Sequence, residues 1–599
     1  MCGIVGYIGN KQTENQLINL LKNLEYRGYD SAGIAVQYNS KIKVVKAEGK
    51  IANFEKLIRP TKAKIGIAHT RWATHGKPTT INAHPHLSQN KQWAVVHNGI
   101  IENFEKLKKE IQERVGIKFV SETDTEVIPQ LLQYVSLNNK SNIQTFIQTC
   151  NMLQGSFAIA CINQQVKDTL FLAKRKSPLY LAKSKEEIFV ASDPICFAGK
   201  VEEYFALEDD EFCKASLKKV EFYDKSGNKI NKKPIEMQEF EQFDGKGLYE
   251  HFMLKEINET STVLDRMVKT YQDNDVFKKI SLNIVNSINK IALIGCGTAY
   301  HASLMGAKYI ETFARIDCKA YVASEFRYSN PIIDKNTLCI FVSQSGETAD
   351  TLCAQELARS KGALTIGLTN VLYSALAKNV DIVLPVCAGP EIAVASTKAY
   401  TAQIAILYML ARYLESIKFN RDIDYISPIY CMSQNLQFSD LDEVEQLSQE
   451  LIEQKSAFFI GRGFDYITAE EASLKLKEIT YINSSAHPSG ELKHGFLALI
   501  EEGSYLFVIA TDKELLDKNL NGANEAFSRG AKVVLFTQLD IDKEKTKFVH
   551  KIIKLPKFDT ELMPIASIIS FQLLSYLTSI SRGINPDQPR NLAKSVTVE

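Results

Sequence analysis

The chain has 599 residues, and at roughly 150 residues per domain this length predicts about three or four structural units. Its 71 basic and 70 acidic residues nearly cancel, which argues against a general binder of nucleic acid. The eleven cysteines include no C-x-x-C pair, so we expect neither a disulfide framework nor a zinc site, and a reduced, cytoplasmic setting is favoured.

Neither a signal peptide nor a membrane span is expected. No basic segment precedes the short apolar run Ile4–Ile8. Uninterrupted apolar runs such as Ile404–Leu410 are much shorter than the ~18 residues that a membrane span requires. The sequence therefore predicts a soluble protein that does not bind a membrane.

The first part of the chain has the pattern of an α+β domain. Runs rich in valine, isoleucine and alanine are separated by glycine and asparagine, which is typical of short strands. Two helix-like stretches lie near Gln12–Leu24 and Thr125–Leu137, without regular strand–helix alternation. The strand-like runs include Gly33–Val36, Ile65–Ala68, Trp93–Val96 and Phe157–Ala160.

The second half repeats the order strand, tight turn, helix, which predicts parallel α/β sheets. The pattern occurs at Ile291–Thr298 and Thr337–Gly346, and a further strand is expected at Gly362–Leu368. It returns 166 to 168 residues later, at Phe458–Gly463, Phe507–Thr511 and Gly530–Val534. The constant offset indicates a duplicated α/β unit.

A polar, charged stretch over Lys214–Lys246 places the boundary between the two halves. We predict a first domain over 1–235 and a linker with a helical lead-in over 236–280. The α/β subdomains are expected over 281–420 and 445–590, and a C-terminal tail over 591–599.

Cys2 is the most informative candidate residue. If the initiator methionine is removed, this cysteine carries a thiol and a free α-amine, which titrate near ~8.5 and ~8. The residue then holds a general base beside its nucleophile. Four polar clusters accompany it, at Tyr26–Ser31, His69–Gly76, His97–Gly99 and Ser121–Glu126.

These clusters supply what a thiolate needs to hydrolyse the amide of free glutamine. A turn at Asn98 and Gly99 would offer a side-chain amide and a backbone N–H to an oxyanion. Arg71 offers a fork for the α-carboxylate, and Asp124 offers an acceptor for the α-amine. Plainer interpretations are a hairpin turn at Asn98–Gly99, a surface charge at Arg71, and a helix cap at Thr123 and Asp124.

Two further histidines raise the question of a metal. His84 and His86 are close in sequence, but no third ligand stands at a useful spacing. We therefore favour a structural role for both and expect no metal.

Ser343–Thr348 follows a predicted strand and precedes a predicted helix. Backbone amides at that helix N-terminus, with three hydroxyls and one amide side chain, would cradle a phosphate without a metal. Ligands of open parallel sheets bind at these carboxyl ends. The alternative is a hydroxyl-rich helix cap without a ligand.

A charged cluster follows in the second copy of the unit. Spacings of four, three and seven residues put Glu471, Lys475 and Glu478 on one face of a predicted helix. Moving a sugar carbonyl from C2 to C1 requires a base that shuttles a proton between the two carbons, which suits a carboxylate. His494, in the loop Gly490–Gly495, is the best acid/base histidine of this half. The alternative is an exposed, salt-bridged helix face.

On these residues, the first domain resembles amidotransferase glutaminase domains of the N-terminal nucleophile hydrolase class. The whole chain resembles the family of isomerising glutamine:fructose-6-phosphate aminotransferases, or glucosamine-6-phosphate synthases. The resemblance implies an α+β glutaminase sandwich followed by two doubly wound sugar-isomerase subdomains. It implies transfer of ammonia from L-glutamine to D-fructose 6-phosphate and isomerisation to D-glucosamine 6-phosphate, the first step toward hexosamine precursors. Proton transfers and imine chemistry suffice for this, so no cofactor is expected.

The resemblance also implies roles for individual residues. In the glutaminase site these are Cys2 as nucleophile and base, Asn98 and Gly99 as oxyanion hole, Arg71, His75 and Asp124 as glutamine ligands, and Trp72 as the gate of an ammonia channel. In the sugar site they are Lys594 as Schiff-base lysine, Glu478 as enolisation base, His494 for ring opening and Lys475 as an assisting group. The sugar phosphate would be bound by Thr298, Ser343, Gln344, Ser345, Thr348, Val394, Ser396 and Ala593. A core-packing role is the alternative for Trp72.

The chain departs from the family pattern at Ala299, where many members have serine, and at Phe496, which replaces a proline. The family also implies a homodimer, with His301 contributed across the interface. Three rival functions are a different amidotransferase, a deglycase of amino-acid-linked sugars, and a sugar-phosphate sensor without turnover. The sensor should lack Cys2, Glu478 or Lys594, and all three are present.

Overall fold

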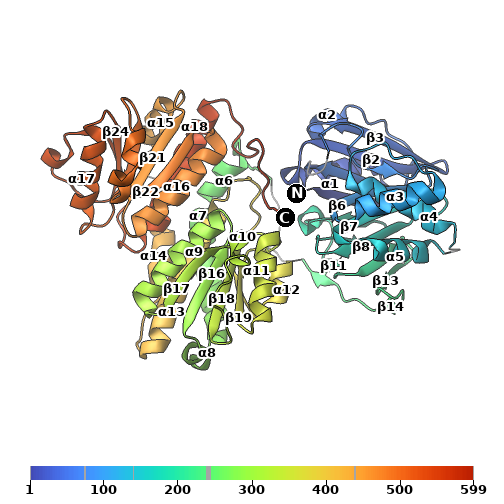
Figure 1. Ribbon diagram of the computed structural model, residues 1–599, viewed down its shortest axis with the longest axis horizontal. Coiled ribbons are helices and arrows are strands. Elements are labelled where there is room, and N and C mark those ends of the chain that lie inside the picture. Colours follow the sequence, from blue (N-terminus) through green and yellow to red (C-terminus); the bar gives the residue numbers. More distant parts are fainter. Residues whose placement is uncertain (1, 73–75, 139–140, 238–244, 438–439, 598–599) are drawn as a thin grey trace. The chain divides into compact units, whose positions relative to one another are not determined.

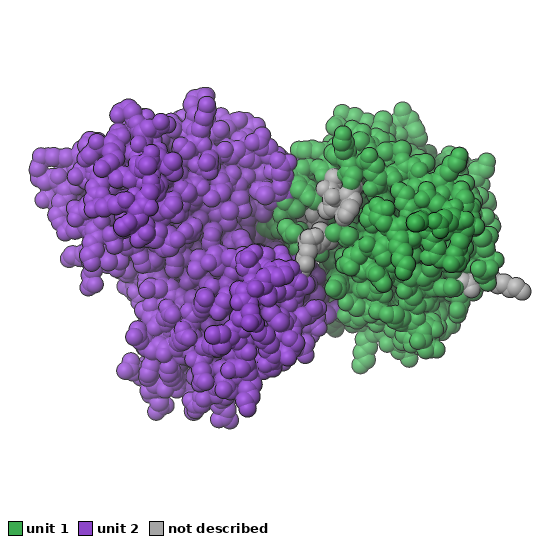
Figure 2. Space-filling view, viewed as in Figure 1, with its two compact units in different colours: residues 1–244, 593–599 green, residues 245–592 purple. Residues whose placement is uncertain are grey.

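The computed structural model describes residues 2–72, 76–138, 141–237, 245–437 and 440–597. The chain forms two compact units (Figure 2). Unit 1 comprises residues 1–244 together with the tail 593–599, and unit 2 comprises residues 245–592.

Unit 1 contains two sheets whose neighbouring strands are antiparallel. The eight-stranded sheet has the order β15-β11-β9-β10-β1-β4-β2-β3, and the seven-stranded sheet has the order β14-β13-β12-β8-β7-β6-β5. The first sheet consists of β1 (Gly3–Ile8), β2 (Ser31–Tyr38), β3 (Lys41–Glu48), β4 (Ile65–Arg71), β9 (Tyr180–Lys183), β10 (Ile188–Ala191), β11 (Glu203–Ala206) and β15 (Ile235–Glu236). The second consists of β5 (His86–Leu87), β6 (Trp93–Ile101), β7 (Gly155–Asn163), β8 (Leu170–Arg175), β12 (Glu211–Ala215), β13 (Val220–Tyr223) and β14 (Lys229–Ile230).

Strand β6 shows how unit 1 is layered, because its side chains alternate between two cores. Ala94 and Val96 lie in the core between the sheets, whereas Trp93 and Val95 pack with helices on the other face. Those helices are α3 (Phe104–Val115), α4 (Val127–Ser136) and α5 (Asn142–Met152) (Figure 1). Helix α1 (Thr13–Lys22) packs on the opposite face of the eight-stranded sheet, next to α2 (Ile51–Glu55). Unit 1 is thus a sandwich of two sheets between helices.

The sequence predicted this α+β sandwich correctly, and each named strand-like run lies in a strand. The predicted turn at Asn98 and Gly99 is wrong, and so is the hairpin alternative. Both residues lie inside β6, opposite Ala158 and Phe157 of β7. All nine residues of β6 pair with β7, and this long-range pairing outweighs the local turn preference of the Asn–Gly dipeptide.

Unit 2 contains two five-stranded parallel sheets with matching orders, β17-β16-β18-β19-β20 and β22-β21-β23-β24-β25. The first consists of β16 (Lys290–Gly295), β17 (Asp317–Val322), β18 (Thr337–Ser343), β19 (Leu364–Thr369) and β20 (Ile382–Pro385). The second consists of β21 (Ser456–Gly461), β22 (Asn483–Pro488), β23 (Tyr505–Ile509), β24 (Lys532–Thr537) and β25 (Val549–Lys554). The matching orders confirm the predicted parallel sheets and the duplication.

Helices surround both sheets of unit 2 (Figure 1). Before the first sheet lie α6 (Phe252–Asn258), α7 (Thr260–Asp273) and α8 (Leu282–Ser287). The first subdomain has α9 (Thr298–Tyr309), α10 (Ala323–Phe326), α11 (Ala349–Ser360), α12 (Ala375–Asn379) and α13 (Lys398–Phe419). The rest are α14 (Ser427–Asn435), α15 (Leu441–Glu450), α16 (Phe464–Thr480), α17 (Leu516–Phe527) and α18 (Met563–Ser581). Residues of α9, α13, α16 and α18 share one hydrophobic core, so the two subdomains are packed together.

Among the described residues, α18 is the one helix that is long and apolar enough to cross a membrane. However, 89% of its most apolar window is buried inside the protein. Its side chains belong to the core that the two subdomains of unit 2 share. We therefore interpret α18 as a core helix.

The first turn of each copy has the same backbone geometry. Gly297 and Gly463, which directly precede α9 and α16, have φ angles of 54° and 60°. A Cβ at Gly295 would lie 2.7 Å from the backbone of Ala299, and a Cβ at Gly461 would lie 2.6 Å from that of Asp465. Each strand thus ends on a glycine that the following helix approaches closely, and Ala299 and Asp465 occupy equivalent positions.

Candidate functional site

Cys2 lies immediately before β1 and is partly exposed. Its Sγ accepts a hydrogen bond from the Trp72 N–H at 3.3 Å and lies 3.5 Å from the Trp72 carbonyl oxygen, to which it donates as a thiol. Burial of the thiol raises its pKa, while the Trp72 N–H and the charge of Arg71 act in the opposite direction. Because the net shift is upward, a base must take the thiol proton before the sulfur can act as a nucleophile.

Strand β6 brings Asn98 to this cysteine. The Asn98 Nδ2 donates to the Cys2 carbonyl oxygen at 2.9 Å, and its Oδ1 lies 3.0 Å from His69 Nε2. Gly99 has φ 127, and a Cβ there would lie 2.1 Å from the Ser156 carbonyl oxygen of β7. The position therefore requires glycine, both for its backbone angle and for the close approach of the neighbouring strand.

Arg71 and Asp124 are buried, so the surface-charge interpretation of Arg71 is wrong. Arg71 ends β4, and its guanidinium donates to the carbonyl oxygens of Gly76 and Lys77, both at 3.4 Å. Burial lowers the pKa of Arg71, and the nearby Cys2 and Asp124 oppose that shift. Asp124 Oδ2 accepts the Ile101 N–H of β6 at 2.8 Å, so this carboxylate is tied to the strand that carries Asn98.

Two further residues were expected near the glutamine. Trp72 is partly exposed, and its ring packs edge-on against Tyr29 with the centroids 5.6 Å apart. It is therefore not a core residue, and its role as a channel gate stays a prediction. His75 lies outside the described residues.

His69, His84 and His86 form a buried cluster beside Asn98, and no sequence signal indicated that the three rings pack together. His69 stacks on His84 with ring centroids 4.1 Å apart, and His86 Nε2 lies 3.1 Å from Thr123 Oγ1. Burial lowers the pKa of His69 to about 3, and it lowers those of His84 and His86 well below the usual value. No group of three potential metal ligands occurs among the described residues. These imidazoles are thus neutral and pack on one another.

In unit 2, Ser343 ends the central strand β18, and Thr348 precedes α11. The loop between them is held by its own hydroxyls. Ser343 Oγ accepts the Gly346 N–H at 3.0 Å, and Ser345 Oγ accepts the Glu347 N–H at 3.2 Å. Thr348 makes no side-chain capping bond to α11, and its Oγ1 lies 3.4 Å from Ser343 Oγ instead. The arrangement does not support the interpretation of Thr348 as a ligand-free cap.

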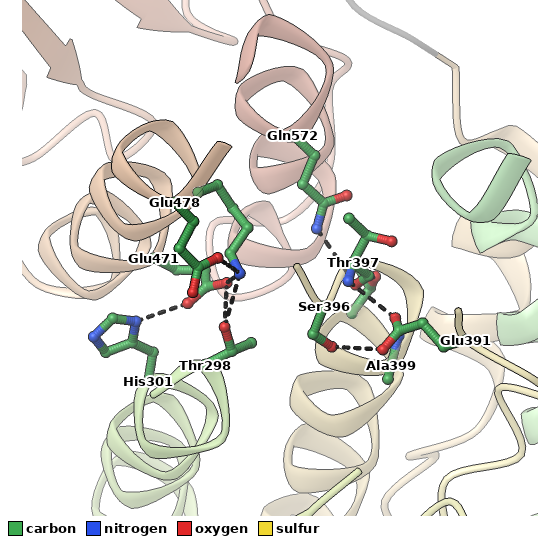
Figure 3. Close-up of polar contacts among 11 residues, drawn as sticks. Thr298, His301, Glu391, Ser396, Thr397, Ala399, Glu471, Glu478 and Gln572 are labelled. Carbon is green, nitrogen blue, oxygen red and sulfur yellow. Dashed lines mark hydrogen bonds and ion pairs between the residues drawn. The ribbon is translucent and has the colours of Figure 1, made fainter. Parts of the chain in front are cut away.

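Thr298 at the start of α9 meets three charged residues of α16 (Figure 3). Lys475 Nζ lies 2.6 Å from Glu478 Oε2, 2.9 Å from Thr298 Oγ1 and 3.4 Å from Glu471 Oε1. The side chains of Lys475 and Glu471 are fully buried, so the exposed-face alternative is wrong. Burial alone would lower the pKa of Lys475, but Glu471 and Glu478 outweigh it and raise that pKa. Glu471 also binds His301 Nδ1 of its own chain at 2.7 Å, so this contact requires no second protomer.

Glu391, which sequence reasoning missed, organises the loop that carries Val394 and Ser396 (Figure 3). Its Oε2 accepts the Ser396 hydroxyl at 2.9 Å, and its Oε1 accepts the N–H groups of Thr397 and Ala399 at 2.9 and 3.0 Å. The last two amides belong to the N-terminus of α13, where a carboxylate is favoured by the helix dipole. No local motif marks this glutamate, because its partners are defined by the fold of the loop.

The remaining predicted residues are His494 of unit 2 and Ala593 and Lys594 of the C-terminal tail. His494 is exposed in a short 3-10 helix, Glu491–His494. Phe496 is buried, and its ring stacks on His487 with the centroids 4.3 Å apart. Ala593 and Lys594 are partly buried in the tail that is grouped with unit 1. Their roles in a sugar site stay predictions.

Family models match both halves of the chain. A glutamine amidotransferase domain matches residues 69–198, and an SIS domain matches residues 284–413 and 450–582. The glutamine–fructose-6-phosphate aminotransferases (isomerizing) of Caldanaerobacter subterraneus subsp. tengcongensis and Clostridium tetani are each 42% identical to the chain over 614 residues. That of Bacillus subtilis is 40% identical over 608 residues. Each of these alignments covers 100% of both chains.

Solved structures resemble unit 2. The C-terminal domain of glucosamine-fructose-6-phosphate aminotransferase from Francisella tularensis matches with a TM-score of 0.53 and 32% identity, covering 58% of this chain and 100% of that one. Tagatose-6-phosphate ketose/aldose isomerase from Escherichia coli matches with a TM-score of 0.50 and 17% identity, covering 57% of this chain and 96% of that one. The second likeness shows the fold alone.

Proposed function

Because the chain belongs to the family of isomerizing glutamine–fructose-6-phosphate aminotransferases, we propose that its two sites divide that reaction between them. The enzyme transfers ammonia from L-glutamine to D-fructose 6-phosphate and isomerises the product to D-glucosamine 6-phosphate. Unit 1 releases the ammonia, and unit 2 captures it on the sugar. The water used to hydrolyse glutamine equals the water released on imine formation, so glutamate is the only other product.

In unit 1, the α-amine of the mature Cys2 takes the thiol proton, and the thiolate attacks the side-chain amide carbon of glutamine. The Asn98 amide and the Gly99 N–H donate to the oxyanion. The amine then protonates the leaving nitrogen, ammonia departs, and water hydrolyses the thioester to glutamate. Arg71 and His75 bind the glutamine, and the Asp124 carboxylate accepts a hydrogen bond from its α-amine. Trp72 gates the path of the ammonia.

In unit 2, the loop Ser343–Thr348 binds the phosphate through hydroxyls and helix-terminal amides. His494 opens the sugar ring, and Lys594 forms a Schiff base at C2 with release of water. Ammonia then adds to C2 and displaces the Lys594 amine, which leaves an imine at C2. Glu478 removes a proton from C1 and returns one to C2. Lys475 stabilises the Glu478 carboxylate by the ion pair at 2.6 Å. The other sugar contacts are Thr298, Val394, Ser396 and Ala593.

A single observation carries the glutaminase assignment: the Asn98 amide lies 2.9 Å from the Cys2 carbonyl oxygen, beside a thiol whose pKa is raised. A hydrogen-bond donor thus lies against the residue that carries the sulfur nucleophile. This arrangement suits amide hydrolysis by an N-terminal thiol, and it has no evident use in a purely structural cysteine.

The experiment is to compare Cys2→Ala with the wild-type enzyme, supplying glutamine and fructose 6-phosphate. Cys2→Ala should abolish glutamine-dependent glucosamine 6-phosphate, while isomerisation of the sugar phosphate persists. Cys431→Ala is the matched control, because that cysteine is exposed and should leave both activities unchanged. Full glutamine-dependent activity in Cys2→Ala, or a retained initiator methionine on the wild-type chain, would show that Cys2 is not the nucleophile.

The resemblance implies a cytoplasmic homodimer, and we include that state in the proposal. The chain mass is 67.3 kDa, so light scattering after size-exclusion chromatography distinguishes one protomer from two. Identification of the product by mass spectrometry separates the proposed reaction from the deglycase alternative. A deglycase would release a sugar phosphate and an amino acid and would form no amino sugar.

A further inference from the structure

We propose that His69 is a positioning residue of the glutaminase, because it fixes which end of the Asn98 amide faces Cys2. The inference rests on the proposed role of Asn98 as an oxyanion donor and deepens it. A side-chain amide presents a donor on one side and an acceptor on the other. If Asn98 rotated by half a turn, its oxygen would face the oxyanion and repel it.

The contacts of His69 decide that orientation. His69 lies on β4, and its Nε2 is 3.0 Å from Asn98 Oδ1 and 3.0 Å from the His97 carbonyl oxygen. Since a carbonyl oxygen can only accept, Nε2 must carry a hydrogen. That hydrogen in turn requires the oxygen of Asn98, and not its nitrogen, to face the ring. The Asn98 Nδ2 is then left to donate toward Cys2, as the 2.9 Å contact with the Cys2 carbonyl oxygen shows.

The surroundings of the ring maintain this tautomer. His69 is fully buried and stacks on His84, with ring centroids 4.1 Å apart and planes 24° apart. The charged and titratable groups that act on it are Arg71, His84, His86 and His97. None of these groups supplies a negative charge that would stabilise an imidazolium. Its Nδ1 has no hydrogen-bond partner among the described residues, which fits a ring whose single hydrogen is on Nε2.

We therefore expect the loss of His69 to lower kcat for glutamine hydrolysis and to leave the binding of glutamine nearly unchanged. Removing the Nε2 donor frees Asn98 to populate the inverted orientation, which places no donor at the oxyanion. Loss of one oxyanion donor typically costs about 10²–10³ in kcat. Partial misorientation should cost less, roughly 10- to 100-fold, while KM for glutamine stays within about twofold.

The test uses the full-length enzyme with His69→Phe, His69→Gln and Asn98→Ala. Phenylalanine retains the ring that stacks on His84 but lacks the donor, and glutamine retains a donor in a similar place. Two rates are measured for each variant: glutamine hydrolysis, and alkylation of Cys2 by iodoacetamide, followed on the N-terminal peptide by mass spectrometry. Alkylation displaces iodide and develops no oxyanion, so it reports on the thiol alone.

We expect His69→Phe to lose roughly 10- to 100-fold in kcat with alkylation within about twofold of wild type, and His69→Gln to recover most of the loss. In the double variant His69→Phe/Asn98→Ala, kcat should fall no further than in Asn98→Ala alone, because both changes remove the same donor. Additive losses, equal falls of kcat and alkylation, or a wild-type kcat in His69→Phe would each overturn the inference.

The same set of variants separates two failures. If Asn98→Ala keeps wild-type kcat, the proposed role of Asn98 is wrong and His69 has nothing to position. If Asn98→Ala loses activity while His69→Phe does not, only the inference about His69 fails. If His69→Phe does not fold, His69→Gln remains as the test. A large loss of kcat with normal alkylation in His69→Gln would overturn the inference, because the glutamine side chain still offers a donor to Asn98.

Discussion

The two copies of the α/β unit in unit 2 share one scaffold but differ at the end of their central strands. In the first copy, β18 leads into Ser343–Thr348, and in the second, β23 leads into Ala510–Leu515. Both loops have the same length, since α11 and α17 begin at the next residue in each. The hydroxyls of the first loop are replaced in the second by an alanine, a carboxylate and a leucine.

In the second loop, the backbone N–H and the hydroxyl of Thr511 are bound by a carboxylate of α16. Asp465 accepts the Thr511 N–H at 2.9 Å and the Thr511 hydroxyl at 2.6 Å. The equivalent position in the first copy is Ala299, which has no carboxylate to place there. A backbone amide of the second loop is therefore bound to a carboxylate, whereas the Gly346 and Glu347 amides of the first loop are bound to that loop's own hydroxyls.

The helices α9 and α16, which follow the first strand of each copy, also differ, and here the charged residues are in the second copy. On α16, Glu471 and Lys475 form a buried ionic cluster, whereas the equivalent residues of α9 are Met305 and Tyr309, both in the hydrophobic core. The two copies thus share a scaffold and differ in the polar residues of these loops and helices. Under the proposed function, the first copy binds the phosphate and the second supplies the acid/base groups.

The largest expected effect tests the acid/base role of the second copy. Glu478→Gln should lower the turnover of fructose 6-phosphate by about 10²–10⁴, because an amide cannot shuttle the proton between C1 and C2. Hydrolysis of glutamine should be unchanged. Glu470→Gln is the matched control on the same helix, since Glu470 accepts from Tyr466 rather than Lys475. Equal turnover in the two variants would exclude Glu478 as the base.

The buried ionic cluster should matter for stability as well. Lys475→Met leaves Glu471 buried beside Glu478 without a cation, and breaking a buried pair in this way costs about 3–5 kcal/mol. The expected result is a clear fall in the midpoint of thermal unfolding. Lys477→Met, at an exposed position of the same helix, should shift that midpoint little. A variant of Lys475 as stable as wild type would mean that the cluster is not charged.

The internal carboxylate should produce a dependence on pH. Burial raises the pKa of Asp465 from 3.8 to about 6, so the folded state holds this proton more tightly than the unfolded state. Its contribution to stability is present below pH ~4 and is lost as pH rises through about 6, by up to about 3 kcal/mol. Asp465→Asn should remove this dependence when unfolding midpoints at pH ~4.5 and ~7.5 are compared. An unchanged pH profile in the variant would mean that Asp465 titrates normally.

The smallest expected effect tests the division between the loops. Thr348→Val should raise KM for fructose 6-phosphate by about tenfold with little change in kcat, because one hydroxyl donor to a charged phosphate is lost. The same substitution in the second loop, Thr511→Val, should leave KM unchanged, since that hydroxyl already binds Asp465. If Thr511→Val also raised KM, the second loop would take part in sugar binding.

Much of the fold followed from the sequence because its signals are local or periodic. Runs of valine, isoleucine and alanine separated by glycine and asparagine marked the strands of unit 1, and recurring glycine turns marked the two copies in unit 2. The helical spacing of Glu471, Lys475 and Glu478 correctly placed them together. Their burial did not follow, because it depends on how α9, α13 and α18 pack around α16.

The errors and omissions have a common physical cause. Asn98–Gly99 has the composition of a turn, but pairing with the whole length of β7 makes it part of a strand. His69 and Glu391 bind partners that only the tertiary fold brings together. His69 belongs to the cluster His69–Gly76, but nothing in that motif shows its contact with Asn98, and Glu391 belongs to no recognisable motif. Side chains that act by orienting other groups leave little trace in a single sequence.

The measurement that most directly tests this account follows the nitrogen atom. The enzyme is supplied with fructose 6-phosphate, glutamine labelled with ¹⁵N in its side-chain amide, and an equal concentration of unlabelled ammonium. The account predicts that the glucosamine 6-phosphate formed carries ¹⁵N at C2 almost throughout, because the nitrogen passes from the Cys2 site to the sugar without mixing with the solvent. A product labelled to the same extent as the bulk ammonium pool would contradict it.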